Sequence, residues 1–293
     1  MRMRSTGPAL VIETPAKLNL HLSVIGRRPD GYHELETVMV SVGLYDTLTF
    51  HAASGDVELC CSGLSGALPA DDSNLVLRAA RLLASSTGCE QGARIHLHKR
   101  IPMQAGMGGG SSDAAATLCG LNELWRLGLT SGQLHELAAR LGSDVNFFLD
   151  SEPLAVCRGR GEKVEAKSLK GPLWLVIAKP QVGLSTAAVF KQLVIADCGG
   201  RGASRLLDAC GRGVTAEVGD LLLNDLELPS RELSQDLSKL LDSFGRFGLP
   251  GVRMTGSGSA CFGVALNREQ AGMAARRLRQ LGMDEVFVVR TAV

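Results

Sequence analysis

The chain has 293 residues, of which 45% are hydrophobic and 21% are charged, which excludes a disordered or collagen-like protein. Its 31 basic and 30 acidic residues nearly balance, whereas a nucleic-acid-binding surface needs a basic surplus. No apolar run approaches the roughly 20 residues that span a bilayer, and no apolar secretory segment follows the basic start. We therefore expect a cytoplasmic protein with neither a membrane nor a nucleic-acid partner.

The first predicted element is a strand from Ala16 to Val24, where apolar and polar residues alternate. This alternation gives the strand one buried face and one polar face. Pro29-Asp30-Gly31 then predicts a turn, because proline fixes φ and glycine accepts a positive φ. The elements expected next are strands within residues 35–50, a helix over residues 74–84 capped by Ser73, and a strand over residues 94–101.

Two helices are predicted before the middle of the chain. Apolar residues recur at helical spacing from about Ser111 to Leu127. Thr130 and Gln133 have the spacing of a capping box, which predicts the start of a second helix. That helix is expected to end at Gly142.

The second half mixes strands and helices without strict alternation. A composition shift at residues 158–172 predicts a boundary between a domain over residues 1–160 and one over residues 161–293. Residues 198–213 contain five glycines and are expected to form a loop of low order. The remaining predictions are a strand over 173–179, helices over 215–227 and 230–243, strands over 252–255 and 260–266, a helix capped by Asn267 and Gln270 that runs to Leu281, and a strand over 285–290. This order favours an α+β fold.

The strongest chemical signal runs from Pro102 to Ala114, where a strand leads into a glycine-rich loop and then into a helix. Glycines let the backbone approach an anion, and the N–H groups at a helix N-terminus favour phosphate. The segment lacks the lysine of a Walker A loop and has the wrong glycine register for a dinucleotide fingerprint. We expect it to bind a polyphosphate, with hydroxyl donors from Ser111 and Ser112. The alternative is a flexible turn before a helix that one of these serines caps.

Three weaker signals lie elsewhere. Lys17 and Asn19 share the polar face of the first strand, and the alternative interpretation is a solvated face. Asp144 lies between a helix end and an apolar run, so it is either functional or an N-cap. The segment from Met254 to Ala260 is a second loop of small residues, which either closes over a ligand or forms a plain hairpin.

These segments, in this order, resemble the GHMP kinase superfamily of galactokinase, homoserine kinase and mevalonate kinase. A narrower resemblance is to the 4-diphosphocytidyl-2-C-methyl-D-erythritol kinases, the ATP-dependent kinases of the non-mevalonate isoprenoid pathway. It runs from about residue 12 to residue 266. The segments that carry it are Pro15-Ala16-Lys17-Leu18-Asn19-Leu20, Arg28-Pro29-Asp30-Gly31-Tyr32-His33-Glu34-Leu35, Asp71-x-x-Asn74-Leu75 and Leu141-Gly142-Ser143-Asp144-Val145.

The resemblance implies a fold with an N-terminal domain like the second domain of ribosomal protein S5 and a ferredoxin-like C-terminal domain. It implies phosphorylation of the 2-hydroxyl group of the cytidyl substrate by ATP with Mg²⁺, in a monomer or weak homodimer. Asp144 would be the general base assisted by Lys17, with Asn19 beside them. The implied nucleotide-binding residues are Asn74, Lys99, Pro102, Met103, Gln104, Ala105, Gly106, Met107, Gly108, Gly109, Gly110, Ser111 and Ser112. Tyr32, His33 and Phe190 would hold the cytidine, with Tyr32 and Phe190 on opposite sides of the base.

Two alternatives remain open. A GHMP kinase for another small alcohol would be favoured if the Asp30-Gly31-Tyr32-His33 segment were missing. A catalytically inactive nucleotide sensor on the same fold would be indicated by loss of Lys17 or Asp144. The sequence retains all of these residues. RNA binding, which an S5-like domain suggests, is disfavoured by the net charge of +1.

Overall fold

The computed structural model describes residues 1–63, 71, 73–195, 198 and 202–292. The chain divides into two compact units that interleave along the sequence. Unit 1 comprises Met1–Ala16, Leu44–Met103 and Gly108–Ser151, and unit 2 comprises Lys17–Gly43, Gln104–Met107 and Glu152–Val293. The predicted domains over residues 1–160 and 161–293 are continuous segments, and that boundary stays a prediction. Helices and strands are mixed in the chain, as the α+β prediction requires.

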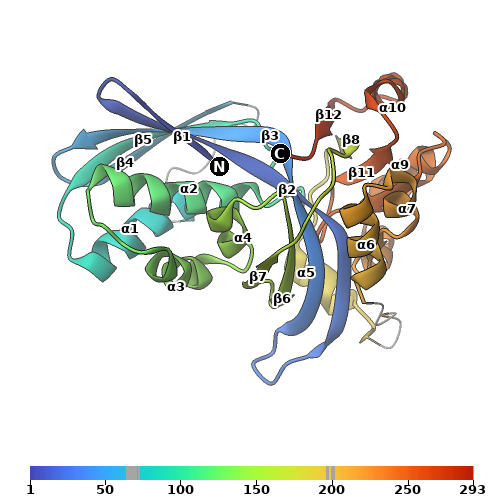
Figure 1. Cartoon of the computed structure of the whole chain (residues 1–293), viewed down its shortest axis with the longest axis horizontal. Helices are drawn as coiled ribbons and strands as arrows, with labels where there is room; N and C mark the ends of the chain where they lie inside the picture. The colour runs from blue at the N-terminus through green and yellow to red at the C-terminus, as the bar shows by residue number, and fades with distance from the viewer. Residues whose placement is uncertain (64–70, 72, 196–197, 199–201, 293) are drawn as a thin grey trace. The chain divides into compact units, whose positions relative to one another are not determined.

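Unit 1 contains a sheet with α1 and α2 along one of its faces (Figure 1). The spatial order of the strands is β1-β2-β3-β5-β4, and the β4–β5 pair is parallel. The longest two strands, β2 and β3, contribute residues to both units. The elements are β1 (Arg2–Thr6), β2 (Ala9–Arg27), β3 (His33–Ala53), β4 (Val57–Gly63), β5 (Gly92–Lys99), α1 (Leu75–Thr87), α2 (Gly109–Leu124), α3 (Ser131–Leu141) and α4 (Val145–Asp150).

A glycine brings α2 close to the sheet. A methyl group at Gly120 would lie 2.7 Å from the ring of Phe50 in β3 and 3.1 Å from the side chain of Ile12 in β2. Any larger residue would push the helix outward. With glycine there, Leu118 and Leu121 of α2 are fully buried. This packing fixes α2, whose start follows the glycine-rich loop, against the sheet of unit 1.

In unit 2, a four-stranded antiparallel sheet has the order β10-β11-β8-β12. Its core contains Val176, Phe244, Met254 and Leu278, contributed by two strands and by the helices α9 and α10. The elements of this layer are β8 (Trp174–Lys179), β10 (Gly251–Met254), β11 (Cys261–Ala265), β12 (Glu285–Arg290), α9 (Gln235–Gly245) and α10 (Arg268–Gln280). The four strands confirm the strands predicted there.

The remaining elements of unit 2 connect to β2 and β3. β6 (Leu154–Gly159) pairs with β3 and with β7 (Lys163–Ala166), and β9 (Leu223–Asn224) pairs in parallel with β2. The other helices are α5 (Thr186–Gln192), α6 (Ser204–Arg212), α7 (Thr215–Asp220) and α8 (Glu227–Leu233). Within the described residues, no helix has both the length and the apolar character needed to cross a membrane.

Two predicted helix starts are confirmed by their caps. At the start of α3, Thr130 and Gln133 form the complete capping box, and Gly142 is the C-cap. At the start of α10, the Asn267 side chain accepts a hydrogen bond from the N–H of Gln270 at 2.9 Å. Each cap satisfies N–H groups that a helix start leaves without backbone partners.

The predicted cap of α1 is wrong by one residue. Asn74 is the N-cap, and its Oδ1 accepts the N–H of Val76 at 3.0 Å. Ser73 instead donates its N–H and its hydroxyl to Asp71. The Asn74 side chain therefore has a structural role in helix capping, and its predicted position beside the nucleotide stays a prediction.

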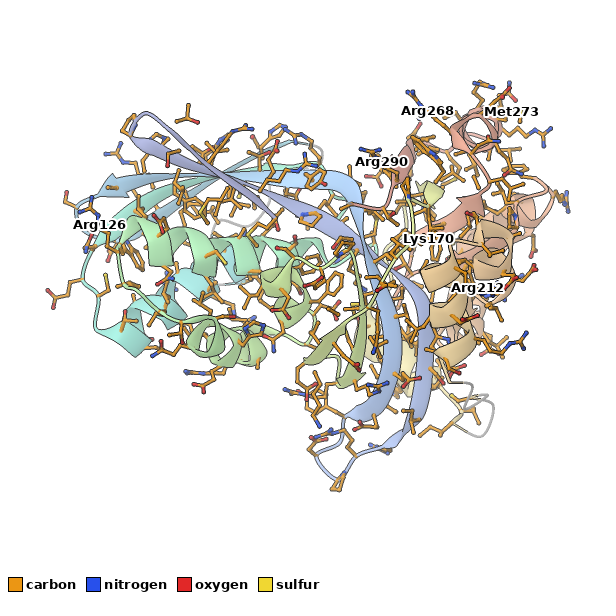
Figure 2. All side chains as sticks on the ribbon, in the orientation of Figure 1. Arg126, Lys170, Arg212, Arg268, Met273 and Arg290 are labelled. Carbon is orange, nitrogen blue, oxygen red and sulfur yellow. The ribbon has the colours of Figure 1, made fainter. Side chains whose placement is uncertain are left out.

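The predicted loop over residues 198–213 is wrong where α6 lies. Leu206, Ala209 and Cys210 are buried at helical spacing, and Gly213 ends the helix in the left-handed region. Arg212, which is labelled in Figure 2, lies in its last turn. Its side chain pairs with Asp208 at 2.8 Å. Residues 199–201 of the predicted loop lie outside the described residues.

The helices predicted over residues 215–227 and 230–243 are divided differently. The first is replaced by α7, by the short strand β9 and by the start of α8. The second is interrupted at Ser234, whose hydroxyl accepts the N–H of Leu237 at 3.2 Å and caps α9. The interruptions contain Asn224 and Ser234. Side chains of these types can hydrogen-bond to the backbone and so compete with the hydrogen bonds of a continuous helix.

Candidate active site

Lys17 and Asn19 lie side by side on the polar face of β2 in unit 2, and both are buried. Lys17 Nζ donates a hydrogen bond to Asn19 Oδ1 at 2.6 Å. Asn19 Nδ2 donates to Thr37 Oγ1 at 2.8 Å. Only 3% of Lys17 and 1% of Asn19 are exposed, which excludes the alternative of a solvated strand face. The ammonium group is thus held in a fixed orientation away from bulk water.

The loop between β10 and β11 packs against this pair of side chains. Thr255 Oγ1 accepts the N–H of Asn19 at 3.1 Å and lies 3.1 Å from Asn19 Oδ1. Asn224 Nδ2 donates to the carbonyl groups of Met254 and Gly256 at 2.8 and 2.9 Å. The loop therefore joins two hairpin strands and also fixes Asn19. We call Lys17, Asn19, Thr37 and Thr255 the lysine cluster.

The first part of the glycine-rich loop, residues 104–107, belongs to the same unit as the lysine cluster. The N–H groups of Ser259 and Ala260 donate to the carbonyls of Gln104 and Ala105, both at 3.2 Å. The N–H of Lys17 donates to the carbonyl of Met107 at 3.0 Å. Three segments that the sequence marked separately are therefore joined by backbone hydrogen bonds.

The second part of the loop, in unit 1, leads into α2. The helix begins at Gly109 with Gly108 as its N-cap, so it starts before the predicted Ser111 and neither serine is its cap. Gly108 has no side chain, and the first N–H groups of α2 therefore lack a side-chain cap. The Ser112 hydroxyl donates to the carbonyl of Pro15 at 2.6 Å. The hydroxyl donor expected from Ser112 is thus used within unit 1.

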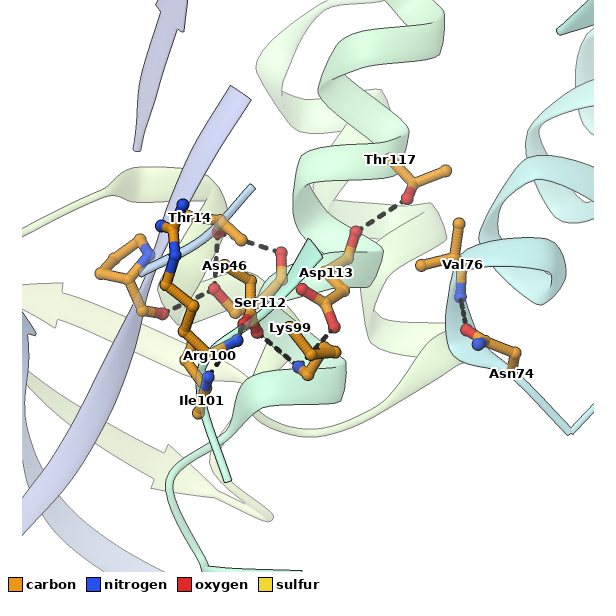
Figure 3. Close-up of polar contacts among 11 residues, drawn as sticks. Thr14, Asp46, Asn74, Val76, Lys99, Arg100, Ile101, Ser112, Asp113 and Thr117 are labelled. Carbon is orange, nitrogen blue, oxygen red and sulfur yellow. Dashed lines mark hydrogen bonds and ion pairs between the residues drawn. The ribbon is translucent and has the colours of Figure 1, made fainter. Parts of the chain in front are cut away.

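Lys99 forms a buried ionic cluster beside the start of α2 (Figure 3). Its Nζ pairs with a carboxylate oxygen of Asp46 and lies 2.8 Å from Asp113 Oδ2. Each of the three side chains is at most 4% exposed. We call these three residues the aspartate–lysine cluster. The Lys99 ammonium makes both of these interactions with side chains of this chain. Its contact with a nucleotide base stays a prediction.

Asp113 is a titratable group of this cluster whose pKa departs from its ordinary value. Burial raises the pKa of Asp113 to about 7, while Lys99 lowers it in part and Asp46 raises it further. Its Oδ1 is buried without a hydrogen-bond partner in the described part of the chain. The folded protein therefore binds the Asp113 proton more tightly than the unfolded chain, where the pKa is about 4. The resulting stability is complete below pH 4 and is lost as the pH rises through 7.

We predict that Asp113→Asn removes this pH dependence, because the amide cannot ionise but can still accept a hydrogen bond from Lys99. The free energy of unfolding of the variant minus that of the wild type should rise between pH 4 and pH 7 and level off above. The rise should be at most about 4 kcal/mol, from ~1.4 kcal/mol per pKa unit. Denaturant unfolding at one-unit pH steps measures it. A difference that is constant across this range would contradict a raised pKa for Asp113.

Asp144 lies in unit 1 at the N-cap position of α4, but its carboxylate makes no capping hydrogen bond. The alternative that Asp144 serves as a side-chain cap is therefore wrong. The residue is half-buried, directly before the fully buried Val145. Asp144 belongs to unit 1 and Lys17 to unit 2, and their action as a catalytic pair stays a prediction.

The residues predicted to hold cytidine lie together in unit 2. The rings of His33 and Phe190 are stacked, with centroids 4.8 Å apart and an angle of 24° between their planes. The Tyr32 side chain is exposed, and the guanidinium of Arg160 lies 4.9 Å from the centre of its ring. His33 therefore contacts Phe190 directly, whereas the prediction placed a base between Tyr32 and Phe190.

Three polar residues in or beside these clusters were not predicted from the sequence. Asp46 carries a usable signal, because it shares the buried face of β3 with Leu48 and Phe50 at a spacing of two. An isolated acid on such a face requires a buried partner. Thr37 and Asn224 carry no comparable signal. Neither residue type is unusual at its position, and only its partner in the folded chain shows its role.

Two sequence profiles match this chain. The GHMP kinases N terminal domain matches residues 74–151, and the GHMP kinases C terminal domain matches residues 206–282. The 4-diphosphocytidyl-2-C-methyl-D-erythritol kinase of Symbiobacterium thermophilum is 44% identical over 287 residues, which cover 96% of this chain and 99% of that protein. The kinase of the same name from Shouchella clausii is 40% identical over 280 residues, with coverage of 95% and 93%.

A solved structure shows the same fold over nearly the whole chain. The crystal structure of a 4-(cytidine 5′-diphospho)-2C-methyl-D-erythritol kinase matches with a TM-score of 0.82 and 36% identity. The match covers 97% of this chain and 100% of that chain. It confirms the predicted GHMP kinase fold. The chain belongs to the GHMP kinase superfamily and, within it, to the 4-diphosphocytidyl-2-C-methyl-D-erythritol kinase family.

Proposed function

We propose that this kinase transfers the γ-phosphoryl group of ATP to the 2-hydroxyl group of 4-diphosphocytidyl-2-C-methyl-D-erythritol, in the non-mevalonate isoprenoid pathway. The names of its relatives support this substrate. The observation that carries the proposal is the lysine cluster, in which Asn19 fixes the buried ammonium of Lys17 and the backbone N–H of Lys17 bonds to the glycine-rich loop. A positive charge placed in this way suits phosphoryl transfer, where catalysis depends on positioning and charge stabilisation.

In this proposal, the backbone of residues 102–112 binds the phosphates of ATP. Gly108 leaves the first N–H groups of α2 without a side-chain cap, and these groups with the helix dipole favour an anion. Residues 104–107 are held by hydrogen bonds from Ser259, Ala260 and Lys17. Donors that are fixed before the substrate binds need no reorganisation during the reaction.

Asp144 would act as the general base. It accepts the proton of the 2-hydroxyl group while that oxygen attacks the γ-phosphorus. The new O–P bond forms as the bond from the γ-phosphorus to the bridging oxygen breaks, and ADP leaves with the electron pair. Lys17 would assist Asp144 and orient the reacting groups. Its own orientation comes from Asn19.

Mg²⁺ would neutralise phosphate charge when it is bound with ATP. Among the residues that the structure describes, no three His, Cys, Asp or Glu side chains form a group that could hold a metal ion. Mg²⁺ commonly keeps several waters and binds mainly through substrate phosphates.

The proposed substrate predicts a strong preference for cytidine over uridine. Cytosine offers an N4 amine donor and an N3 acceptor, whereas uracil presents O4 and N3–H at these positions. The backbone carbonyl and N–H of His33 would match cytosine, while stacking on Tyr32 or Phe190 tolerates any base. Two mispaired groups at about 1–3 kcal/mol each give a preference of at least ~30-fold in kcat/KM, at ~1.4 kcal/mol per factor of ten.

A coupled assay of ADP release with the cytidyl and uridyl substrates measures this preference. Tyr32→Leu should raise KM for both bases and leave their ratio intact. Tyr45→Leu is the matched control, because the only other tyrosine also lies under an arginine, Arg2, but belongs to unit 1. Equal use of both bases by the wild type would favour a GHMP kinase for another alcohol. ATP binding without turnover of any alcohol would favour a nucleotide sensor.

A further inference from the structure

Asp46 lies at the centre of contacts that the proposed chemistry does not use. Its carboxylate is completely buried and accepts hydrogen bonds from three donors (Figure 3). These donors are Lys99 Nζ, the N–H of Arg100 at 2.6 Å and the N–H of Ile101 at 2.9 Å. Lys99 is the last residue of β5, and Arg100 and Ile101 follow it immediately before Pro102 and the glycine-rich loop. One side chain therefore fixes the point where the strand becomes the loop.

Lys99 extends this contact to the other end of the loop. Its Nζ donates to Asp113 Oδ2 at 2.8 Å, five residues into α2. A methyl group at Gly109 would lie 3.0 Å from Lys99 Nζ and 3.1 Å from the Ile101 side chain. The ammonium group and the end of β5 thus lie directly against the first turn of α2. Through Asp46, Lys99 and Asp113, the two ends of the loop in unit 1 are joined.

Burying the charged side chains of Asp46, Lys99 and Asp113 stabilises a core less effectively than apolar packing would. Removing charges from water costs several kcal/mol per ion, and buried ion pairs can often be replaced by apolar residues without loss of stability. An apolar side chain at residue 46 would leave the N–H groups of Arg100 and Ile101 without an acceptor. What Asp46 supplies is a defined geometry for the strand-to-helix connection. Phosphate binding by backbone N–H groups depends on such prior order.

We propose that Asp46 is a positioning residue for the nucleotide. It holds residues 99–113 in the conformation that binds the ATP phosphates, and it acts through Lys99 and the two backbone N–H groups without touching the nucleotide. This inference rests on the proposed function, because it assigns ATP to this loop. Asp46→Asn keeps the shape of the side chain but replaces one acceptor oxygen with a donor. At least one of the three hydrogen bonds is then lost.

The first test is the affinity of Asp46→Asn for ATP, measured by calorimetry without the alcohol substrate. The Kd should rise at least about tenfold, whereas kcat at saturating ATP and KM for the alcohol should stay within about twofold. Glu58→Gln is the matched control, since it removes an acid from β4, the strand next to β5. Glu58 and its partner Arg94 are 74% and 73% exposed, so the Kd should not change.

Amide hydrogen exchange in the absence of nucleotide separates positioning from direct contact. Asp46→Asn should accelerate exchange at Arg100, Ile101 and Ser112 and leave α3 unchanged. Wild-type exchange at these amides, or an unchanged Kd for ATP, would overturn the inference. Equal losses in ATP affinity and alcohol KM, with a lower Tm, would overturn it too, because they indicate a merely structural role.

The exchange measurement also separates this inference from the proposed function. If the wild type bound no ATP, the proposed function would fail, while the exchange pattern would still decide whether Asp46 holds the connection. If Asp46→Asn does not fold, Lys99→Gln tests the part of the arrangement that passes through Lys99. It leaves Asp46 bonded to the backbone and weakens the link to Asp113. Faster exchange at Ser112 is expected, and unchanged exchange there would contradict the link.

Discussion

Replacing Asp144 with asparagine should reduce kcat by about 10²–10⁴-fold while ATP still binds with its wild-type Kd. An amide cannot take the proton of the attacking hydroxyl group, and loss of general-base assistance has this size. The Asp144 side chain makes no capping hydrogen bond to α4, so the substitution should not weaken that helix. Initial rates at saturating concentrations of both substrates give kcat, and calorimetry gives the Kd for ATP.

A carboxylate at the other end of the same helix provides the control. Asp150 is the last residue of α4 and lies 2.8 Å from His135 Nε2 on the surface of unit 1. Asp150→Asn should change kcat by less than about twofold, because such exposed pairs contribute little. An Asp144→Asn variant that retained more than a tenth of the wild-type kcat would show that another group accepts the proton.

Elements defined by neighbouring residues could be predicted from the sequence. The alternation from Ala16 to Val24 predicts a strand where β2 lies, and the observed strand begins earlier because Ala9–Glu13 pair with β1. The capping box of Thr130 and Gln133 works within one helical turn. Such signals need no knowledge of the rest of the chain.

Other features depend on partners that are distant in the sequence, and spacing does not reveal those. Asp46 and Lys99 are 53 residues apart, and Asn19 and Thr255 are 236 residues apart. The same cause explains the wrong cap of α2. A serine near a helix start is normally a good N-cap, but the Ser112 hydroxyl donates instead to the carbonyl of Pro15, which is 97 residues away in the sequence. The tertiary contact therefore overrides the local preference.

The missed helix α6 has a different explanation. Five glycines between residues 198 and 213 suggest a loop, yet most of them flank the helix or end it. Leu206, Ala209 and Cys210 supply the buried face, but three small or medium apolar residues give a weak periodic signal. The prediction gave too much weight to glycine content and too little to this spacing.

The closest backbone contact within the lysine cluster and its loops is made at Gly106, and Gly106→Ala should lower kcat/KM for ATP at least about 10²-fold. A methyl group at this position would lie 2.1 Å from the carbonyl oxygen of Thr255 and 3.1 Å from the nitrogen of Gly258. Both are backbone atoms, so the two loops would have to separate. The hydrogen bonds from Ser259 and Ala260 to residues 104 and 105 would then be strained. A displacement of about 1 Å at a reacting centre costs on the order of 10²-fold in rate.

Gly128→Ala separates this contact from the ordinary cost of replacing a left-handed glycine. Gly106 and Gly128 have φ values of +71° and +66°, but no atom lies within 4 Å of a methyl group at Gly128. Both substitutions should lower stability by roughly 1 kcal/mol, because an L-residue is strained in this region, and Gly106→Ala should lower it further because its methyl group clashes with the backbone of Thr255. Only Gly106→Ala should also lose activity, because only at Gly106 does the backbone of a second loop occupy the space of the added methyl group. Thermal unfolding and initial rates of both variants test this. If Gly106→Ala retained wild-type kcat/KM, the close approach of the two loops would not be needed for catalysis. The position of the glycine-rich loop would then not affect Asn19 and Lys17 through Thr255.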